Sequence, residues 1–397
     1  MRATDLRPLV EGRFDDYLET LREMVDIDCG TFTPDGVNRI ADLCEKEFTA
    51  AGFEIDRRKH QPKVQGDERL GDLVVGSLEG KGSTRILLIG HMDTVFPEGT
   101  AQERPFRIEG DRAFGPGVID MKSGLLGGFV ALEALSEAGF DGFGRITYVC
   151  NPDEEIGSPF SKPLIRELAR ETDVCFVLEG GRENGNLVSA RKGVADVVIE
   201  VTGKAAHAGV NPDRGRSAIV EASHKVLALH ELNGRWPGVT VNAGAIAGGT
   251  RANVVAEHCR VHVDVRSPRD ETFDAALEEV SRIGRSATLD GITSTVEVRD
   301  AHRPFEKTEA SARLVTLAQE IAGELGFEVA DQATGGASDG NTTAAEGVPT
   351  LDGVGPIGGD PHGPDEWLDL TSVVPRMSLL AALVARVSDA TLYSGRP

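Results

Sequence analysis

Hydrophobic residues recur every three to four positions in two stretches near the start of the chain, residues 14–27 (FDDYLETLREMVDI) and 38–53 (NRIADLCEKEFTAAGF). This spacing predicts two amphipathic helices. Three shorter stretches are almost continuously apolar, as strands covered on both faces of a parallel or mixed sheet are: 85–90, 145–150 and 174–178. A further helix is predicted at 122–139, between the first two of these strands. The alternation predicts a layered α/β domain.

The pattern changes near residue 195. The next hundred residues follow the order β-α-β-β-α-β, with strands predicted at 195–203, 239–248, 252–267 and 294–302 and helices at 216–232 and 269–284. This order is the split βαβ arrangement of ferredoxin-like domains. In the third strand, Val261, Val263 and Val265 alternate with polar residues, so we expect one face of this sheet to be exposed to water.

From residue 305 the first pattern resumes, with helices predicted at 310–327 and 373–387. We therefore predict two domains. Residues 1–194 and 305–397 form the larger α/β domain, and residues 195–304 form an inserted domain.

The 397-residue chain has a formal net charge of −22 and a sequence pI near 4.9, which argue against nucleic acid or an anionic membrane as a partner. The N-terminal segment lacks an apolar signal region, and no apolar run suggests a membrane span, so we expect a cytoplasmic protein. The cysteines are scattered and lack C-x-x-C spacing, which argues against a disulfide framework or a thiolate zinc site: Cys29, Cys44, Cys150, Cys175 and Cys259.

Chemically active side chains follow the predicted strands of the larger domain. His91 and Asp93 end the first strand, Glu154 and Glu155 follow the second, and Glu179 ends the third. Ligands bind at the carboxyl ends of strands in α/β sheets. Asp120 in a glycine-rich turn and His362 in a late loop join His91, Glu154, Glu155 and Glu179 in a set of two imidazoles and four carboxylates. Nitrogen and oxygen ligands without thiolate suit zinc, with cobalt or manganese as alternatives, and two ions sharing a carboxylate need about this many groups.

Nine motifs occur in order along the chain: GHMDTV, GPGVIDMKSG, NPDEEIGS, VLEGG, TGKAAHAG, TRANVV, DVR, GGASDGN and PHGPDEW. Together they resemble the dinuclear-zinc exopeptidase family of glutamate carboxypeptidases, aminoacylases, acetylornithine deacetylases and succinyl-diaminopimelate desuccinylases, and most of all the glutamate carboxypeptidase group. The resemblance implies a zinc-exopeptidase-like α/β/α catalytic domain, an inserted ferredoxin-like domain that serves as lid and dimerisation surface, and a homodimer.

The resemblance also assigns roles to single residues. It makes His91, Asp120 and Glu179 the ligands of one zinc ion. The second zinc ion is then held by Glu155 and His362 together with Asp120, which bridges the two ions.

Four further residues receive roles from the same resemblance. Glu154 matches the general base, which takes a proton from a water held between the ions and passes it to the leaving amine. Asp93 matches the partner that orients His91. His207, in the lid, matches the residue that stabilises the oxyanion, from the same or the neighbouring subunit. Asp153 is expected to be only a turn residue.

The resemblance predicts hydrolysis of an amide bond that releases a C-terminal, glutamate-like amino acid from a small N-acyl or peptidyl substrate. Asn253, Arg266 and Arg303 match positions that bind the substrate carboxylate, although ordinary surface salt bridges are the alternative for both arginines. Ser338 is expected to line the substrate pocket. The alternative activity is deacylation of an N-acyl amino acid, of the acetylornithine deacetylase, desuccinylase or aminoacylase type.

Two rival interpretations are weaker. Residues 336–340 (GASDG) match the G-x-S-x-G elbow of serine hydrolases, but the preceding segment is polar and rich in glycine, where that elbow needs an apolar strand. A non-catalytic binding protein with this fold is the other rival. Loss of catalysis usually removes the base or a ligand, and each of these residues is present.

Overall fold

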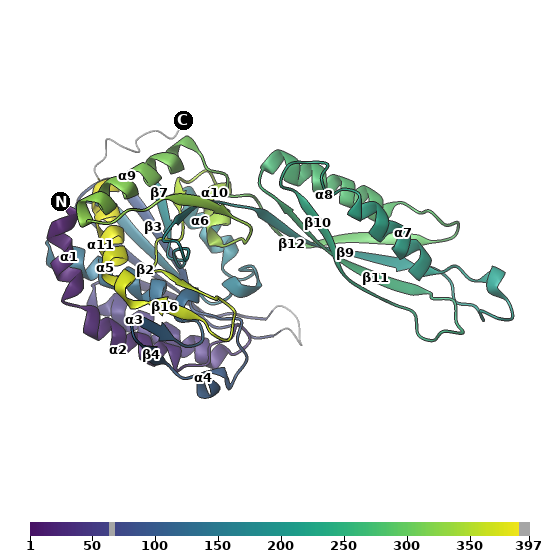
Figure 1. Cartoon of the computed structure of the whole chain (residues 1–397), viewed down its shortest axis with the longest axis horizontal. Coiled ribbons are helices and arrows are strands. Elements are labelled where there is room, and N and C mark those ends of the chain that lie inside the picture. The colour runs from purple at the N-terminus through teal and green to yellow at the C-terminus, as the bar shows by residue number, and fades with distance from the viewer. Residues whose placement is uncertain (63–67, 389–397) are drawn as a thin grey trace. The chain divides into compact units, whose positions relative to one another are not determined.

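The structure, a computed structural model, describes residues 1–62 and 68–388. It forms two compact units (Figure 1). The larger unit, called the catalytic unit because the resemblance predicts catalysis there, contains residues 1–189 and 307–333 and the segment that begins at Ser338. The smaller, inserted unit contains residues 190–306 and 334–337. The inserted domain predicted at 195–304 lies within the first of these two segments.

A six-stranded mixed sheet organises the catalytic unit, in the order β1-β2-β6-β3-β7-β14. The strands are β1 (Glu54–Arg58), β2 (Leu73–Glu79), β3 (Arg85–His91), β6 (Arg145–Asn151), β7 (Val174–Val177) and β14 (Thr350–Leu351). Strand β3 is parallel to its neighbours β6 and β7, and β14 is parallel to β7, whereas β2 is antiparallel to both of its neighbours, β1 and β6. The three apolar runs therefore form strands of a mixed sheet, as predicted, and the structure places them next to one another as β6, β3 and β7.

Helices cover both faces of this sheet, so the catalytic unit has the predicted α/β/α layers. The alternation of buried residues on β3 assigns the faces. Ile86 and Leu88 belong to the main core, whereas Leu87 and Ile89 belong to a second core on the other face. The main core contains residues of α1 (Ala3–Glu11), α2 (Phe14–Val25), α3 (Pro34–Ala50), α5 (Ser123–Glu137), α9 (Glu309–Leu325) and α11 (Leu370–Val387). The second core is covered by α6 (Lys162–Arg170), against which α10 (Asp339–Ala345) packs.

Helix α11 was predicted as a closing helix, but its composition has a second property. It is long and apolar enough to cross a membrane, with a mean hydropathy of 1.5 over 18 residues. However, 72% of this window is buried inside the structure. Because α11 packs against α1, α5 and α9, its apolar surface is that of a core helix.

Several short elements lie outside the six-stranded sheet. A small four-stranded sheet has the order β15-β16-β5-β4, and strand β13 pairs with β8. Their bounds, with that of the short helix α4, are β4 (Arg107–Glu109), β5 (Arg112–Phe114), β8 (Leu187–Arg191), β13 (Asp331–Thr334), β15 (Gly358–Gly359), β16 (Trp367–Asp369) and α4 (Thr100–Glu103). The small sheet holds the late loop with His362 between β15 and β16.

The inserted unit has the predicted order β-α-β-β-α-β. Its elements are β9 (Gly193–Thr202), α7 (Ala218–His230), β10 (Thr240–Gly248), β11 (His258–Ser267), α8 (Asp270–Arg285) and β12 (Thr293–His302). All strand pairs are antiparallel, in the order β10-β11-β9-β12. Val261, Val263 and Val265 are buried, and the residues between them are partly exposed, as predicted.

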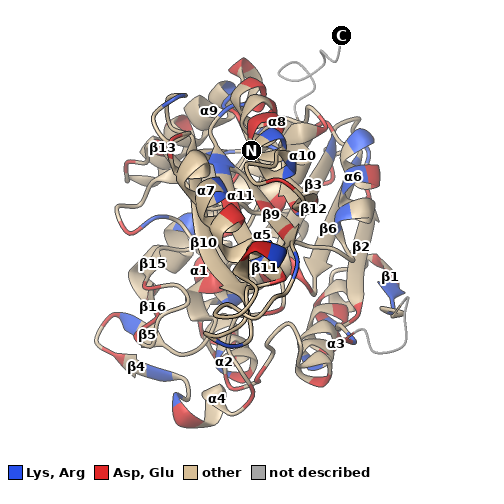
Figure 2. Cartoon of the chain, turned by 90° about the vertical axis from the view of Figure 1, so that its right-hand side faces the viewer, with Lys and Arg blue, Asp and Glu red and all other residues tan. Residues whose placement is uncertain are grey.

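Strand β11 begins six residues later than the sequence pattern predicted. Its partner β10 ends at Gly248, which pairs with Cys259, so the residues between them form the connection of the hairpin. Both acidic and basic residues occur along α6 and α8 (Figure 2). All five cysteines are buried and free, as the sequence indicated.

Candidate active site

The candidate site forms at the carboxyl ends of the central strands. β3 ends in His91, β6 is followed by the acidic turn with Glu154 and Glu155, and Glu179 lies two residues after β7. Because β3 is parallel to both neighbours, these ends share one edge of the sheet. Asp120 lies in the turn that precedes α5, and His362 lies in the loop after β15.

Two groups of three residues converge at this edge, and Asp120 belongs to both. In the first, Nε2 of His91 lies 3.0 Å from Oδ1 of Asp120 and 3.6 Å from Oε1 of Glu179. In the second, Nε2 of His362 lies 3.1 Å from Oδ2 of Asp120 and 3.3 Å from Oε2 of Glu155. In each group the three donor atoms lie within 4.8 Å of one another. The two oxygens of Asp120 thus face different histidines, as a bridging carboxylate would.

Asp93 connects the histidine of β3 to the acidic turn. Its Oδ1 lies 3.4 Å from Nδ1 of His91, and its backbone oxygen lies 2.9 Å from the same nitrogen. The carboxylate also accepts hydrogen bonds from the backbone N–H groups of Glu154 and Glu155, at 3.1 and 3.2 Å. The hydroxyl of Thr31 donates a further bond of 2.6 Å. Asp93 therefore fixes both the His91 ring and the turn that carries the two glutamates.

Glu366 was not predicted from the sequence. Its side chain is 1% exposed and accepts hydrogen bonds from the backbone N–H groups of Gly117, Ile119 and Asp120, at 2.8 to 3.0 Å. Burial raises the pKa of Glu366 to about 7. The only sequence signal was its place in the motif PHGPDEW, since its partners lie almost 250 residues earlier.

Asp153, interpreted as a turn residue, has a larger role, and that interpretation was wrong. The side chain is fully buried and accepts hydrogen bonds from Phe160 N–H and Ser161 Oγ, both at 2.6 Å. These hydrogen bonds hold residues 160 and 161 against the start of the acidic turn. Burial raises the pKa of Asp153 to about 7.

The carboxylates that surround His91 and His362 give both groups a negative charge that favours bound cations. Burial lowers the pKa of His91, but the carboxylates of Asp120, Asp93 and Glu179 outweigh burial and raise it well above its usual value. Asp120 and Glu155 raise the pKa of His362 to about 10. Among the described residues, Oε1 of Glu155 is a buried oxygen without a hydrogen-bond partner. Nitrogen and carboxylate donors, with an oxygen still to be satisfied, suit zinc or a similar divalent ion.

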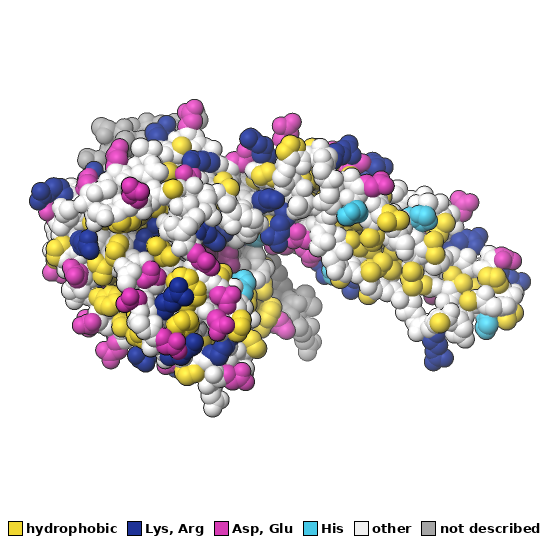
Figure 3. Space-filling view, in the orientation of Figure 1, with side chains coloured by type: hydrophobic (Ala, Val, Ile, Leu, Met, Phe, Trp, Pro, Cys, Tyr) yellow, Lys and Arg dark blue, Asp and Glu magenta, His cyan; other side chains and the backbone are white. Residues whose placement is uncertain are grey.

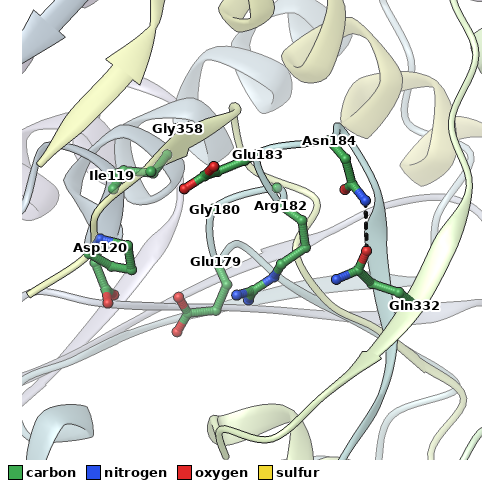
Figure 4. Close-up of a pocket in the computed structure, with 12 residues that line it drawn as sticks. Ile119, Asp120, Glu179, Gly180, Arg182, Glu183, Asn184, Gln332 and Gly358 are labelled. Carbon is green, nitrogen blue, oxygen red and sulfur yellow. Dashed lines mark hydrogen bonds between the residues drawn. The ribbon is translucent and has the colours of Figure 1, made fainter.

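A pocket of about 360 Å³ opens beside the first group (Figure 4). Asp120 and Glu179 contribute to its wall, and so does the loop that follows β7. The remaining lining residues are Ile119, Gly180, Gly181, Arg182, Glu183, Asn184, Gln332, Gly358, Gly359 and Pro361. Its volume is within the range of small-molecule pockets.

The other predicted site residues belong to the inserted unit, except Ser338. His207 is exposed, and its Nδ1 accepts a hydrogen bond of 3.2 Å from Gly209 N–H. Asn253 is also exposed, and its backbone oxygen accepts from Ala208 N–H at 3.0 Å. This hydrogen bond brings the segments that carry His207 and Asn253 close together within the inserted unit.

Both predicted carboxylate-binding arginines form ion pairs within the inserted unit. Nη1 and Nη2 of Arg303 contact the two oxygens of Asp274, at 2.6 and 3.0 Å. Nε of Arg266 lies 3.0 Å from Oδ1 of Asp264, and its Nη1 donates to the backbone oxygen of Gly335 at 2.9 Å. These contacts match the salt-bridge alternative, and a role of either arginine in binding the substrate carboxylate stays a prediction.

Ser338 is placed differently from its prediction. It is 2% exposed and is the N-cap of α10, where its Oγ accepts a hydrogen bond from Gly340 N–H and donates one of 2.6 Å to Asp352. The pocket described above does not include it. A hydroxyl that is buried and donates to a carboxylate is not an exposed nucleophile, so the structure also argues against the serine-hydrolase interpretation.

The profile of Peptidase family M20/M25/M40 matches residues 87–386. Carboxypeptidase G2 of Pseudomonas sp. (strain RS-16) is 32% identical over 388 residues, covering 96% of this chain and 90% of the relative. Acetylornithine deacetylase of Edwardsiella ictaluri is 27% identical, covering 77% of this chain and 81% of the relative.

Solved structures of peptidases have a similar fold over almost the whole chain. The aminopeptidase PepT of Bacillus cereus superposes with a TM-score of 0.76 at 25% identity, covering 95% of this chain and 99% of that one. A tripeptidase from Staphylococcus aureus has a TM-score of 0.77 at 23% identity, covering 94% and 98%, and shows the shared fold. The chain therefore belongs to Peptidase family M20/M25/M40 and is a metal-dependent hydrolase of that family, a metallopeptidase or amidohydrolase.

Proposed function

We propose that this enzyme is a dinuclear zinc carboxypeptidase that releases a C-terminal, glutamate-like amino acid from a small N-acyl amino acid or short peptide. The observation that carries the proposal is the convergence of two ligand groups on the shared carboxylate of Asp120, next to Glu154. The similarity to carboxypeptidase G2 supports the carboxypeptidase branch over other activities of the family.

The proposed first zinc ion is held by His91, Asp120 and Glu179, and the second by Asp120, Glu155 and His362. When bound, two such ions supply a water of lowered pKa and polarise the substrate carbonyl. Cobalt or manganese are the substitutes that the same nitrogen and oxygen donors accept.

Glu154 is the proposed proton carrier. Its backbone is held by the hydrogen bond to Asp93, so its position is fixed relative to the ligands. Burial, together with the nearby carboxylates of Glu179 and Asp339, raises the pKa of Glu154 well above its usual value. A carboxylate in such surroundings takes a proton readily from the attacking water and returns it to the leaving nitrogen.

The inserted unit supplies the proposed substrate contacts. Arg266 and Arg303, with Asn253, bind the carboxylate of the released amino acid, and His207 donates to the oxyanion. The exposure of His207 and Asn253 and the partial exposure of both arginines support these roles.

Amine release from a substrate panel tests the proposal. The panel contains acyl-glutamate, folate-type and dipeptide substrates, N-acetylornithine and succinyl-diaminopimelate, with zinc supplied and a chelator as control. We expect chelator-sensitive release with preference for a C-terminal glutamate. Preference for N-acetylornithine or succinyl-diaminopimelate would instead place the enzyme with the deacylases, the class of the acetylornithine deacetylase that is 27% identical to this chain. No turnover with both metals bound would contradict the proposal.

We also propose a homodimer formed through the inserted unit. Its edge strand β10 and helix α7 carry large exposed hydrophobic side chains: Ile219, Val220, Leu227 and Ile246. Figure 3 shows hydrophobic side chains gathered on one face of this unit. Sedimentation should give about twice the 42.3 kDa mass of one chain, and Leu227→Asp should shift it toward the monomer.

A cytoplasmic location is part of the proposal, supported by the five free, buried cysteines.

A further inference from the structure

The pocket beside the first ligand group contains a guanidinium that the proposed mechanism does not use. Arg182 lies in its wall, three residues after Glu179. Its Nε is buried and has no hydrogen-bond partner among the described residues. In Figure 4 the Arg182 side chain extends toward the same side of the pocket as the carboxylate of Glu179, whereas the carboxylate of Glu183 points away from it. A buried donor that lacks a partner costs free energy, so the pocket favours a ligand that accepts from it.

A second donor faces the same space. Oε1 of Gln332 accepts hydrogen bonds from the side-chain amides of Asn184 and Asn186, at 2.9 and 3.0 Å. These bonds place the oxygen of Gln332 toward the two asparagines and leave its amide N–H groups for the pocket. Figure 4 shows this nitrogen on the side of Arg182. The two side chains together form a donor-rich wall that suits a carboxylate.

Arg376 donates hydrogen bonds to the backbone around the loop that carries Arg182. Arg376 is 1% exposed and donates through Nε to the backbone oxygen of Gly355 at 2.9 Å and through Nη1 to that of Gly185 at 3.2 Å. Gly181 N–H donates to the backbone oxygen of Pro356 at 2.8 Å. The pocket wall is therefore built on fixed backbone, which lowers the entropy cost of binding.

The position of the pocket decides which part of the substrate it receives. Asp120 and Glu179 lie in its wall, so it begins at the first proposed ion. The inference rests on the proposed function, in which residues of the inserted unit bind the released amino acid. The pocket is then left for the acyl side of the scissile amide. We propose that Arg182 is a specificity-determining residue that binds a carboxylate on the acyl side of the substrate.

Four N-acetylated dipeptides test this proposal with the zinc-loaded enzyme: acetyl-Glu-Glu, acetyl-Gln-Glu, acetyl-Glu-Leu and acetyl-Gln-Leu. Glutamate and glutamine have nearly the same shape, so the first position isolates the acyl-side charge. We expect the wild-type enzyme to favour acyl-side glutamate by about tenfold to hundredfold in kcat/KM, as a hydrogen bond to a charged group provides. The effect should be in KM rather than kcat. The C-terminal residue, glutamate or leucine, separately tests the specificity for the released amino acid that the proposed function predicts.

Variants assign the preference to Arg182. Arg182→Gln should lower kcat/KM for acyl-side glutamate to about the value for acyl-side glutamine, and Arg182→Lys should keep part of the preference. Gln332→Glu, which adds a negative charge to the same wall, should lower kcat/KM for acyl-side glutamate alone. Arg58→Gln removes an exposed arginine from β1 and is the matched control.

The outcomes separate the two proposals. Equal hydrolysis of the acyl-side Glu and Gln substrates by the wild-type enzyme, or an equal loss on all four in Arg182→Gln, would overturn the role of Arg182. Release of leucine as readily as glutamate would instead overturn the proposed specificity for the leaving residue, and the acyl-side comparison would still be readable. No hydrolysis of any of the four with both metals bound would overturn both.

Discussion

The carboxylate of Glu366 accepts a hydrogen bond of 3.0 Å from the backbone N–H of Asp120, the residue shared by both ligand groups. The same carboxylate receives the N–H groups of Gly117 and Ile119, so one side chain fixes the whole turn. Glu366 therefore acts on the site without contacting either proposed ion. Partners of this kind determine how accurately a ligand is presented to a metal.

Replacing Glu366 should weaken metal binding more than it changes the fold. The amide of Glu366→Gln keeps one acceptor oxygen where three N–H groups need two, so the turn with Asp120 loses its fixed geometry. We expect zinc affinity to fall about tenfold to hundredfold. Competition with a chromophoric chelator measures this directly. Glu109→Gln, at an exposed ion pair with Arg107, is the control. Unchanged affinity in Glu366→Gln would show that Asp120 is positioned by other contacts.

Glu154 should be separable from the metal ligands. Glu154→Gln keeps the shape and the backbone hydrogen bond to Asp93 but removes the proton acceptor. We expect kcat to fall by about a hundredfold or more, since general base catalysis contributes about 10² to 10⁴ in rate. Elemental analysis of Glu154→Gln should find the same metal content as in the wild-type enzyme. Loss of metal together with activity would assign Glu154 to the ligands instead.

Ser338 should matter for stability and not for chemistry. Ser338→Ala removes the N-cap of α10 and the donor to Asp352. The loss of a cap costs about 1 kcal/mol, and a buried acceptor that loses a donor costs about 1–3 kcal/mol more. Denaturant unfolding should therefore show a lower free energy of unfolding, whereas kcat should stay close to the wild-type value. Abolished turnover in a folded Ser338→Ala protein would revive the serine-hydrolase interpretation.

The sequence predicted those parts of the fold and candidate site that depend on local patterns. Three apolar runs defined β3, β6 and β7, and the residues just beyond them lie together because parallel strands end at one edge. The start of β11 was missed, because the apolar pattern continues into the connection although the pairing with β10 ends at Gly248. Alternation of side chains does not reveal where a partner strand stops.

Residues whose side chains accept hydrogen bonds from backbone N–H groups were not found from the sequence. Glu366 and Asp153 accept from N–H groups, and a backbone donor leaves no trace in the sequence of its partner. Ser338 was placed in the pocket by resemblance, whereas its burial as a helix cap follows from packing that the motif does not encode. Arg182 lies in no recognised motif, and only the pocket gives it significance.

Glu221 and Lys225 form a buried ion pair in the inserted unit, with Oε1 and Nζ 3.1 Å apart and both side chains at most 2% exposed. Burial alone would raise the pKa of Glu221, but hydrogen bonds from the backbone N–H groups of Thr288 and Leu289, with Lys225, lower it below its ordinary value. The folded state therefore binds this proton more weakly than the unfolded chain, whose glutamate pKa is about 4.3. The stabilisation is complete above that pH and is lost as the pH falls through the lower folded-state pKa.

Glu221→Gln should therefore destabilise the inserted unit at neutral pH by about 3 kcal/mol, because it leaves Lys225 buried without its carboxylate. The difference from the wild type should shrink as the pH falls below about 4, where the wild-type glutamate also becomes neutral. Trp236 is the tryptophan of the inserted unit, so its fluorescence in a Trp367→Phe background reports unfolding of that unit. Glu200→Gln, at the exposed pair with Arg260, should change stability by less than about 1 kcal/mol. A Glu221→Gln effect that is small at neutral pH, or constant down to pH 3, would show that the backbone donors and not the charge hold this corner of the unit.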